Sequence, residues 1–169
     1  IPSRKQAAAM VRSLTDPSRL GGEHPWPSLA RTDPGFDAVT GEYWRGGVWL
    51  PIVYMGTKAL ERYGYTELAD TLARRVLRQQ SNAYKEGEPH TIWGCYSPSS
   101  STEYGRRVRP EFCGWSALGP ISLFIENVLG FRRADALSGT LYWSLDLRNG
   151  THGIRNFKFG DIRTDILYN

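Results

Sequence analysis

The side chains best suited to chemistry gather in residues 42–51, where two tryptophans, a tyrosine and an arginine surround a Gly-Gly pair. Aromatic rings present flat faces to the C–H groups of a sugar ring, and a guanidinium is a planar fork that donates to hydroxyls or carboxylates. The same residues would also plug a hydrophobic core at the start of a helix, because Trp and Tyr bury well in any domain. Composition alone therefore fits either a carbohydrate-contacting surface or core packing.

Four segments that follow one another along the chain carry a resemblance to a known family. They are residues 25–37, Tyr43-Trp44-Arg45-Gly46-x-Val48-Trp49, residues 90–98 and residues 112–120. Together they resemble the inverting glycoside hydrolases built on an (α/α)6 barrel, in particular glycoside hydrolase family 63 and the mannosylglycerate-hydrolase-like proteins. Residues 90–98 are similar to the family's Ile-Trp-Glu-x-Tyr-x-Pro segment, and residues 112–120 are similar to the Gly-Trp-Ser opening of a late barrel helix.

The resemblance implies a fold, an activity and a partner. The fold is mainly α: the C-terminal part of an (α/α)6 barrel of the six-hairpin glycosidase type, with the N-terminal rest of the barrel as partner. The activity is hydrolysis, with inversion, of an α-linked glucosyl or mannosyl bond in an oligosaccharide or small glycoside, and no cofactor is implied. The chain begins at Ile1 without a readable leader, so we expect a fragment of a longer protein and predict no compartment.

The catalytic carboxylates are where this sequence departs from the family's pattern. Inverting glycosidases need two carboxyl groups about 6.5–9.5 Å apart, one as acid and one as base. The resemblance implies an acid in the first part of the barrel, which this chain lacks, and a glutamate base at the position of Gly94. Glu42, Glu103 and Glu111 are weak candidates to replace the base, because each fits a loop charge as well, and Glu42 also fits an ion-pair partner of Arg45. We therefore expect this chain to be inactive alone.

The substrate-binding residues are expected where two long loops each enter a helix through a Trp-bearing motif. The expected set is Tyr43, Trp44, Arg45, Trp49, Trp93 and Trp115. The alternatives are core packing for Trp49 and a buried structural salt bridge for Arg45. Two other functions also fit the sequence: a catalytically dead carbohydrate-binding homologue, and a helical interaction module that uses exposed apolar helix faces.

Charge and hydropathy argue against two classes of partner. The 21 basic and 17 acidic residues give a net charge of +4, spread along the chain. Nucleic-acid binding needs a denser basic stripe, and the cluster Arg106, Arg107 and Arg109 is typical of a solvated loop. A membrane span needs about 18 unbroken apolar residues, which this sequence lacks. We therefore predict neither a nucleic-acid nor a membrane partner.

The cysteines and histidines do not predict a metal site. The three histidines are scattered, and neither Cys95 nor Cys113 has a second Cys or His at ligand spacing. Each cysteine lies in one of the motif segments, and the pair fits either a disulfide or two buried thiols. No metal is predicted.

Helical periodicity predicts the elements that position these motifs. The expected helices cover residues 4–15, residues 48–63, a stretch that starts at residue 66, and residues 116–129. The second and third should form an antiparallel hairpin through Gly64, the repeating unit of an α/α barrel. Two long polar loops, residues 18–47 and 83–114, separate the helices, and loops of this length in a compact domain argue for function.

After residue 134 the apolar pattern changes to a period of two, which is typical of half-buried strands. Strands are expected around residues 141–147, 157–159 and 162–166. Asn149-Gly150 and Gly160-Asp161 supply the turns, and we expect one small antiparallel sheet. The chain then divides into a partial barrel domain, residues 1–133, and a β appendage, residues 134–169.

Overall fold

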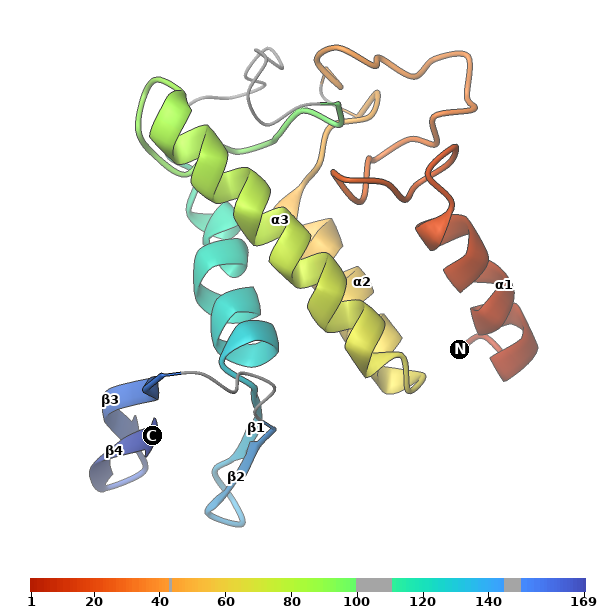
Figure 1. The fold of residues 1–169 in the computed structure, drawn as a ribbon. Coiled ribbons are helices and arrows are strands. Elements are labelled where there is room, and N and C mark those ends of the chain that lie inside the picture. The colour runs from red at the N-terminus through yellow and green to blue at the C-terminus, as the bar shows by residue number, and fades with distance from the viewer. Residues whose placement is uncertain (43, 100–110, 145–149) are drawn as a thin grey trace.

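The computed structural model describes residues 1–42, 44–99, 111–144 and 150–169 (Figure 1). The helices of residues 50–128 lie at the centre of the molecule, and the helix of residues 4–15 lies to one side of them. Long loops gather at one end of the central helices, and two pairs of strands lie at the other end. Several residues of the sequence predictions lie outside the described ranges: Tyr43, Glu103, Arg106, Arg107, Arg109, Asn149 and the last part, residues 145–147, of an expected strand.

Helix α1 spans Arg4–Thr15, as the periodicity predicts. It begins with a capping box, in which the Ser3 hydroxyl accepts the Gln6 N–H at 3.3 Å and the Gln6 side chain accepts the Ser3 N–H at 2.8 Å. It ends at Thr15, because Pro17 disfavours a helical conformation at Asp16, the residue before it.

Helices α2 (Leu50–Arg62) and α3 (Thr66–Glu86) form the predicted hairpin. Pro51 lies in the first turn of α2, where its missing N–H breaks no intrahelical bond. Gly64 makes the tight connection with a φ of +86°, a left-handed conformation that favours glycine. No helix in the described ranges has the length and apolar character to cross a bilayer.

The prediction of one regular helix over residues 116–129 is wrong. Residues Gly114–Leu118 form a 3₁₀ helix (η1), and Gly119–Val128 form a π-helix (η2) that packs along α3. The wider winding shows in the hydrogen bond from the Leu129 N–H to the Phe124 carbonyl, at 2.9 Å. Pro120 follows the junction and has no N–H to continue an α-helical ladder, which is a physical reason for the change of winding.

Two hydrophobic clusters hold the helices together. The larger one joins α2, α3, η2 and the intervening loop, through Val48, Leu50, Val53, Ala73, Val76, Ala83, Trp93, Tyr96 and Leu123. The smaller one joins α1 to the hairpin and contains Trp26, Leu60, Ala69 and Leu72, with Val11, Leu14, Leu20, Tyr65 and Leu68 packed against it. The first long loop is thereby anchored, because the Trp26 Nε1–H also donates to the Leu14 carbonyl at 3.0 Å.

A largely buried ion pair joins the hairpin to the first strand. The Arg132 guanidinium donates through both terminal nitrogens to the Asp70 carboxylate, each at 2.6 Å. The Asn127 amide bridges this pair to α2, since its Nδ2 donates to Asp70 at 2.9 Å and to Glu61 at 2.6 Å. The side chains of Asp70 and Arg132 are only 7% and 18% exposed. The pair therefore works in a medium where charges interact more strongly than in water.

In the described residues, the C-terminal strands form two separate antiparallel pairs, which corrects the expectation of one sheet. Strand β1 (Phe131–Asp135) pairs with β2 (Thr140–Trp143), and β3 (His152–Phe159) pairs with β4 (Ile162–Tyr168). The Phe131 ring links the pairs, lying 4.9 Å from Trp143 and 6.3 Å from Phe157. Alternation reveals a strand but not its pairing, and the Phe-Arg-Arg-Ala-Asp sequence of β1 lacks the alternation that would have predicted it.

Candidate functional site

Isolated antiparallel β-bridges join the four motif segments at the loop end of the helices. Pro27 pairs with Val48, Val48 with Tyr96, and Trp93 with Phe112. The central bridge has both of its hydrogen bonds, at 2.9 and 3.0 Å between the backbones of Val48 and Tyr96. Segments up to 85 positions apart in the sequence, Pro27 to Phe112, are thus linked through their backbones into one group. We name it the motif rim, and it comprises residues 25–37, 44–49, 90–98 and 112–116.

Three tryptophans from two motifs of this rim lie together. The Trp44 and Trp49 rings stack with centroids 4.6 Å apart and planes inclined by 21°. The Trp115 ring meets Trp49 edge to face, at 6.1 Å and 88°. Trp49 is 2% exposed, whereas Trp44 and Trp115 are 47% and 49% exposed. Trp49 therefore packs in the core, as the alternative to a substrate-binding role had it. It supports two indoles that remain open to solvent.

The other predicted substrate-binding residues take different places. Arg45 is exposed, which rules out the buried salt bridge as its role, and its Nε–H donates to the Gly35 carbonyl at 3.2 Å. Trp93 belongs to the larger hydrophobic cluster, where it stacks on Tyr96 with centroids 5.7 Å apart. Arg45 thus follows the exposed Trp44 in the sequence, whereas Trp93 lies in the core.

The structure describes two of the three carboxylate candidates and the glycine that they would replace. Glu42 and Glu111 are both exposed, as loop charges are, and Glu103 lies outside the described residues. Gly94 is buried, and its carbonyl accepts a hydrogen bond from the Ser116 hydroxyl at 3.3 Å. In the described part of the chain, no group of three or more His, Cys, Asp or Glu side chains could hold a metal ion.

Both cysteines of the rim are free thiols, so the disulfide alternative is not formed in the structure. Cys95 is fully buried, and this burial raises the pKa of its thiol to about 12. Such a thiol stays protonated at neutral pH and behaves as a small core residue, which argues against a nucleophilic role for it.

Asp37 holds the loop that leads to Trp44 and Arg45. Its carboxylate accepts hydrogen bonds from the Thr40 hydroxyl and from the backbone N–H groups of Thr40, Val39 and Glu42. The bonds from Thr40 contribute most, and together these donors lower the pKa of Asp37 to about 2. The Asp37 N–H in turn donates to the Arg45 carbonyl at 2.7 Å, which closes the loop.

This arrangement predicts an acid-sensitive loop. Because the folded-state pKa of Asp37 lies below its ordinary value, its stabilisation is present above about pH 4 and is lost as the pH falls toward 2. We expect the thermal midpoint of the unsubstituted chain to fall more steeply over this range than that of Asp37→Asn. Thr40→Val, which removes one donor, should give an intermediate slope. Equal slopes for the unsubstituted chain and Asp37→Asn would show that these bonds do not form.

Two polar side chains hold the loops of the rim in place, and the sequence predictions gave neither of them a role. Arg31 donates to the carbonyls of Gly21 at 2.7 Å and Pro98 at 3.1 Å, which ties the first long loop to the second. Gln79 of α3 donates to the Ser97 carbonyl at 2.6 Å. Arg31 lies in a motif segment but was given no role, and Gln79 lies in none, because residue spacing does not distinguish an Arg or Gln that bonds to distant backbone from a solvated one.

With this geometry in place, comparison with known proteins identifies the class. Residues 1–116 match the family model described as the mannosylglycerate hydrolase MGH1-like glycoside hydrolase domain. The chain belongs to this family of glycoside hydrolase domains. The resemblance drawn from the four motifs is therefore confirmed.

Individual relatives match only a part of their length. The chain is 36% identical over 99 residues to mannosylglycerate hydrolase of Rubrobacter radiotolerans, covering 56% of this chain and 22% of that protein. It is 48% identical over 90 residues to mannosylglycerate hydrolase MGH1 of Selaginella moellendorffii, covering 52% of this chain and 16% of the relative. The chain thus spans about a fifth of these curated relatives.

Among solved structures, the glycoside hydrolase family 63 mannosylglycerate hydrolase of Thermus thermophilus, in complex with Tris, has a similar fold. The TM-score is 0.51 at 23% sequence identity, and the match covers 73% of this chain and 26% of that one. Further structures of that enzyme are complexes with glucose and with Tris and D-glycerate. At this identity the likeness concerns the fold.

Proposed function

We propose that this chain supplies a sugar-contacting surface of an inverting glycoside hydrolase that cleaves α-linked glucosyl or mannosyl bonds in an oligosaccharide or small glycoside. The observation that carries the proposal is the cluster of Trp44, Trp49 and Trp115 on the motif rim. The half-exposed rings of Trp44 and Trp115 offer apolar faces to sugar C–H groups. Arg45, exposed beside Trp44, is placed to donate to hydroxyls or to the carboxylate of a glycerate.

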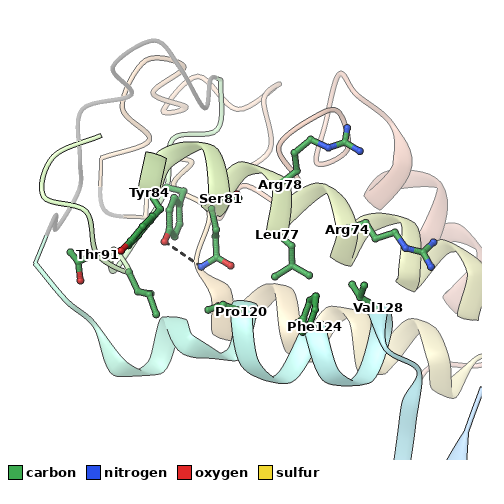
Figure 2. Close-up of a pocket in the computed structure, with 12 residues that line it drawn as sticks. Arg74, Leu77, Arg78, Ser81, Tyr84, Thr91, Pro120, Phe124 and Val128 are labelled. Carbon is green, nitrogen blue, oxygen red and sulfur yellow. Dashed lines mark hydrogen bonds between the residues drawn. The ribbon is translucent and has the colours of Figure 1, made fainter. Parts of the chain in front are cut away.

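The proposed fold of the parent is an (α/α)6 barrel, of which residues 1–133 form a C-terminal part and residues 134–169 an appendage. The α2–α3 hairpin supports this proposal, and so does an apolar pocket of about 670 Å³ between α3 and η2. Leu77 of α3 faces Phe124 and Val128 of η2 across this pocket (Figure 2). In a complete barrel such a face is covered by neighbouring helices, and here the rest of the barrel is the expected partner. The proposed boundary falls inside β1, so the change from helix to strand comes earlier, at Gly130.

The proposed inactivity of this chain alone follows from the chemistry of inversion. A base must take a proton from the attacking water, and the hydrogen side chain of Gly94 cannot accept one. Of the carboxylates considered as a replacement, Glu42 and Glu111 are exposed loop residues. A carbohydrate-binding protein that has lost its catalytic groups is consequently the second candidate function.

The proposal is tested by calorimetric titration of the chain with methyl α-D-mannoside and with D-glycerate. We expect the unsubstituted chain to bind and Trp44→Ala to bind about tenfold more weakly. A tenfold loss is about 1.4 kcal/mol of binding free energy, which is within the range for one aromatic platform. Tyr142→Ala is the matched control, since Tyr142 is 50% exposed but lies on β2. An equal loss of affinity in both variants, or an unsubstituted chain that binds neither probe, would refute the proposal.

A second arm of the experiment separates the two candidate functions. Gly94→Glu is introduced into the full-length parent, and release of mannose or glucose from α-linked substrates is measured. Restored turnover would show a hydrolase that lacks only its base. Binding without turnover would favour the carbohydrate-binding homologue.

A further inference from the structure

We propose that Gln80 is a positioning residue of the motif rim. Its buried side-chain amide sets the placement of the segment that carries Gly94 relative to the segment that carries Trp115. This inference rests on the proposed function in one respect, namely that these two segments form part of a sugar site.

One amide group contacts both segments. The Gln80 side chain projects from α3 and is 7% exposed. Its Nε2–H groups donate to the Tyr96 hydroxyl at 3.2 Å and to the Ser116 carbonyl at 3.5 Å. Tyr96 and Ser116 are 20 positions apart in the sequence and come from different motifs. A rigid helix thus serves as the common reference for both.

Two further hydrogen bonds extend this contact to the backbone around Gly94. The Tyr96 hydroxyl accepts the N–H of Trp93 at 3.1 Å, and the Ser116 hydroxyl donates to the carbonyl of Gly94 at 3.3 Å. Tyr96 is 4% exposed and Ser116 is fully buried, so water does not compete for these groups. If Gln80 loses its amide, buried partners lose a donor and the segments must shift to satisfy them.

Close packing fixes the amide itself. A Cβ atom placed on Gly119, the first residue of η2, would lie 2.0 Å from the Gln80 Oε1 and 3.0 Å from its Nε2. The Gly119 backbone is right-handed helical, with a φ of −66°, so alanine is compatible with its conformation but not with the space. Gly119→Ala therefore displaces the amide without changing its chemistry, and it provides a second, independent variant.

The test is site-resolved amide hydrogen exchange under native conditions, together with the sugar titration. The Trp93 N–H is the direct reporter, because it donates to the hydroxyl that Gln80 holds. We expect Gln80→Leu and Gly119→Ala to accelerate exchange at Trp93 and Ser116 by about tenfold, the scale of one or two lost hydrogen bonds. Sugar affinity should fall by a similar factor at a temperature where the variants remain folded.

Asn127→Leu is the matched control. Asn127 is 1% exposed and also loses two side-chain hydrogen bonds, to Asp70 and Glu61, but it lies near the C-terminal end of η2. In Asn127→Leu, amide exchange at Trp93 and Ser116 should change only as far as global stability changes. If Gln80→Leu and Gly119→Ala behave like this control, Gln80 is a packing residue and the inference is overturned. If exchange rises as expected in Gln80→Leu and Gly119→Ala while the unsubstituted chain binds no sugar, the positioning role stands and the proposed function fails.

Discussion

Replacing Arg132 by methionine is expected to lower the free energy of unfolding by about 3 kcal/mol. The substitution keeps much of the apolar stem but leaves the Asp70 carboxylate, 7% exposed, without its two donors at 2.6 Å. Removing one member of a buried pair is costly because the remaining charge has lost both its hydration and its partner. Urea titration followed by far-ultraviolet circular dichroism measures the change, provided that the m-value, the slope of the free energy of unfolding against urea concentration, is the same in both proteins.

The neighbouring residue supplies the control for this prediction. Arg133 also forms an ion pair, with Asp135 at 2.9 Å, but its side chain is 65% exposed. Arg133→Met should therefore change the stability by no more than about 0.5 kcal/mol, since exposed pairs contribute little. The double variant Asp70→Leu/Arg132→Met should lose less than the sum of its single changes, because it removes both charges together. Equal effects of Arg132→Met and Arg133→Met would contradict the burial of the pair.

Trp49→Ala is expected to destabilise the chain by about 4 kcal/mol, the scale of a large aromatic removed from a core. The indole is 2% exposed and contacts both Trp44 and Trp115, so its loss opens a cavity beneath the rim. Sugar binding should be lost as well, since the two exposed rings lose their support. Urea unfolding and calorimetry on the same preparation measure both effects.

Trp44→Ala separates these two effects. Trp44 is 47% exposed, and its removal should cost no more than about 1.5 kcal/mol of stability, the value of one aromatic stack, while it weakens sugar binding. The contrast between the variants thus distinguishes a supporting indole from a contacting one. A Trp49→Ala variant as stable as Trp44→Ala would place the Trp49 ring outside the core.

Helices α1, α2 and α3 were predictable because their signals are local. Apolar periodicity, a proline in a first turn and a glycine after a last turn act within a few residues of the element that they define. The winding of η1 and η2 was not predictable in this way, because an apolar stripe does not distinguish α, 3₁₀ and π forms. The pairing of the strands failed for a related reason: alternation is a property of one strand, and pairing is a property of two.

The motifs alone were sufficient to identify the family, because a family motif consists of residue types in a fixed order. The assignment of Gly94 to the position of the family's base stays a prediction. Packing was required to divide the tryptophans into roles: Trp49 and Trp93 buried, Trp44 and Trp115 half exposed. It was also required to reveal Gln80 beneath the rim. Exposure and long-range hydrogen bonds depend on which segments meet in space, and residues many positions apart in the sequence carry no local mark of that meeting.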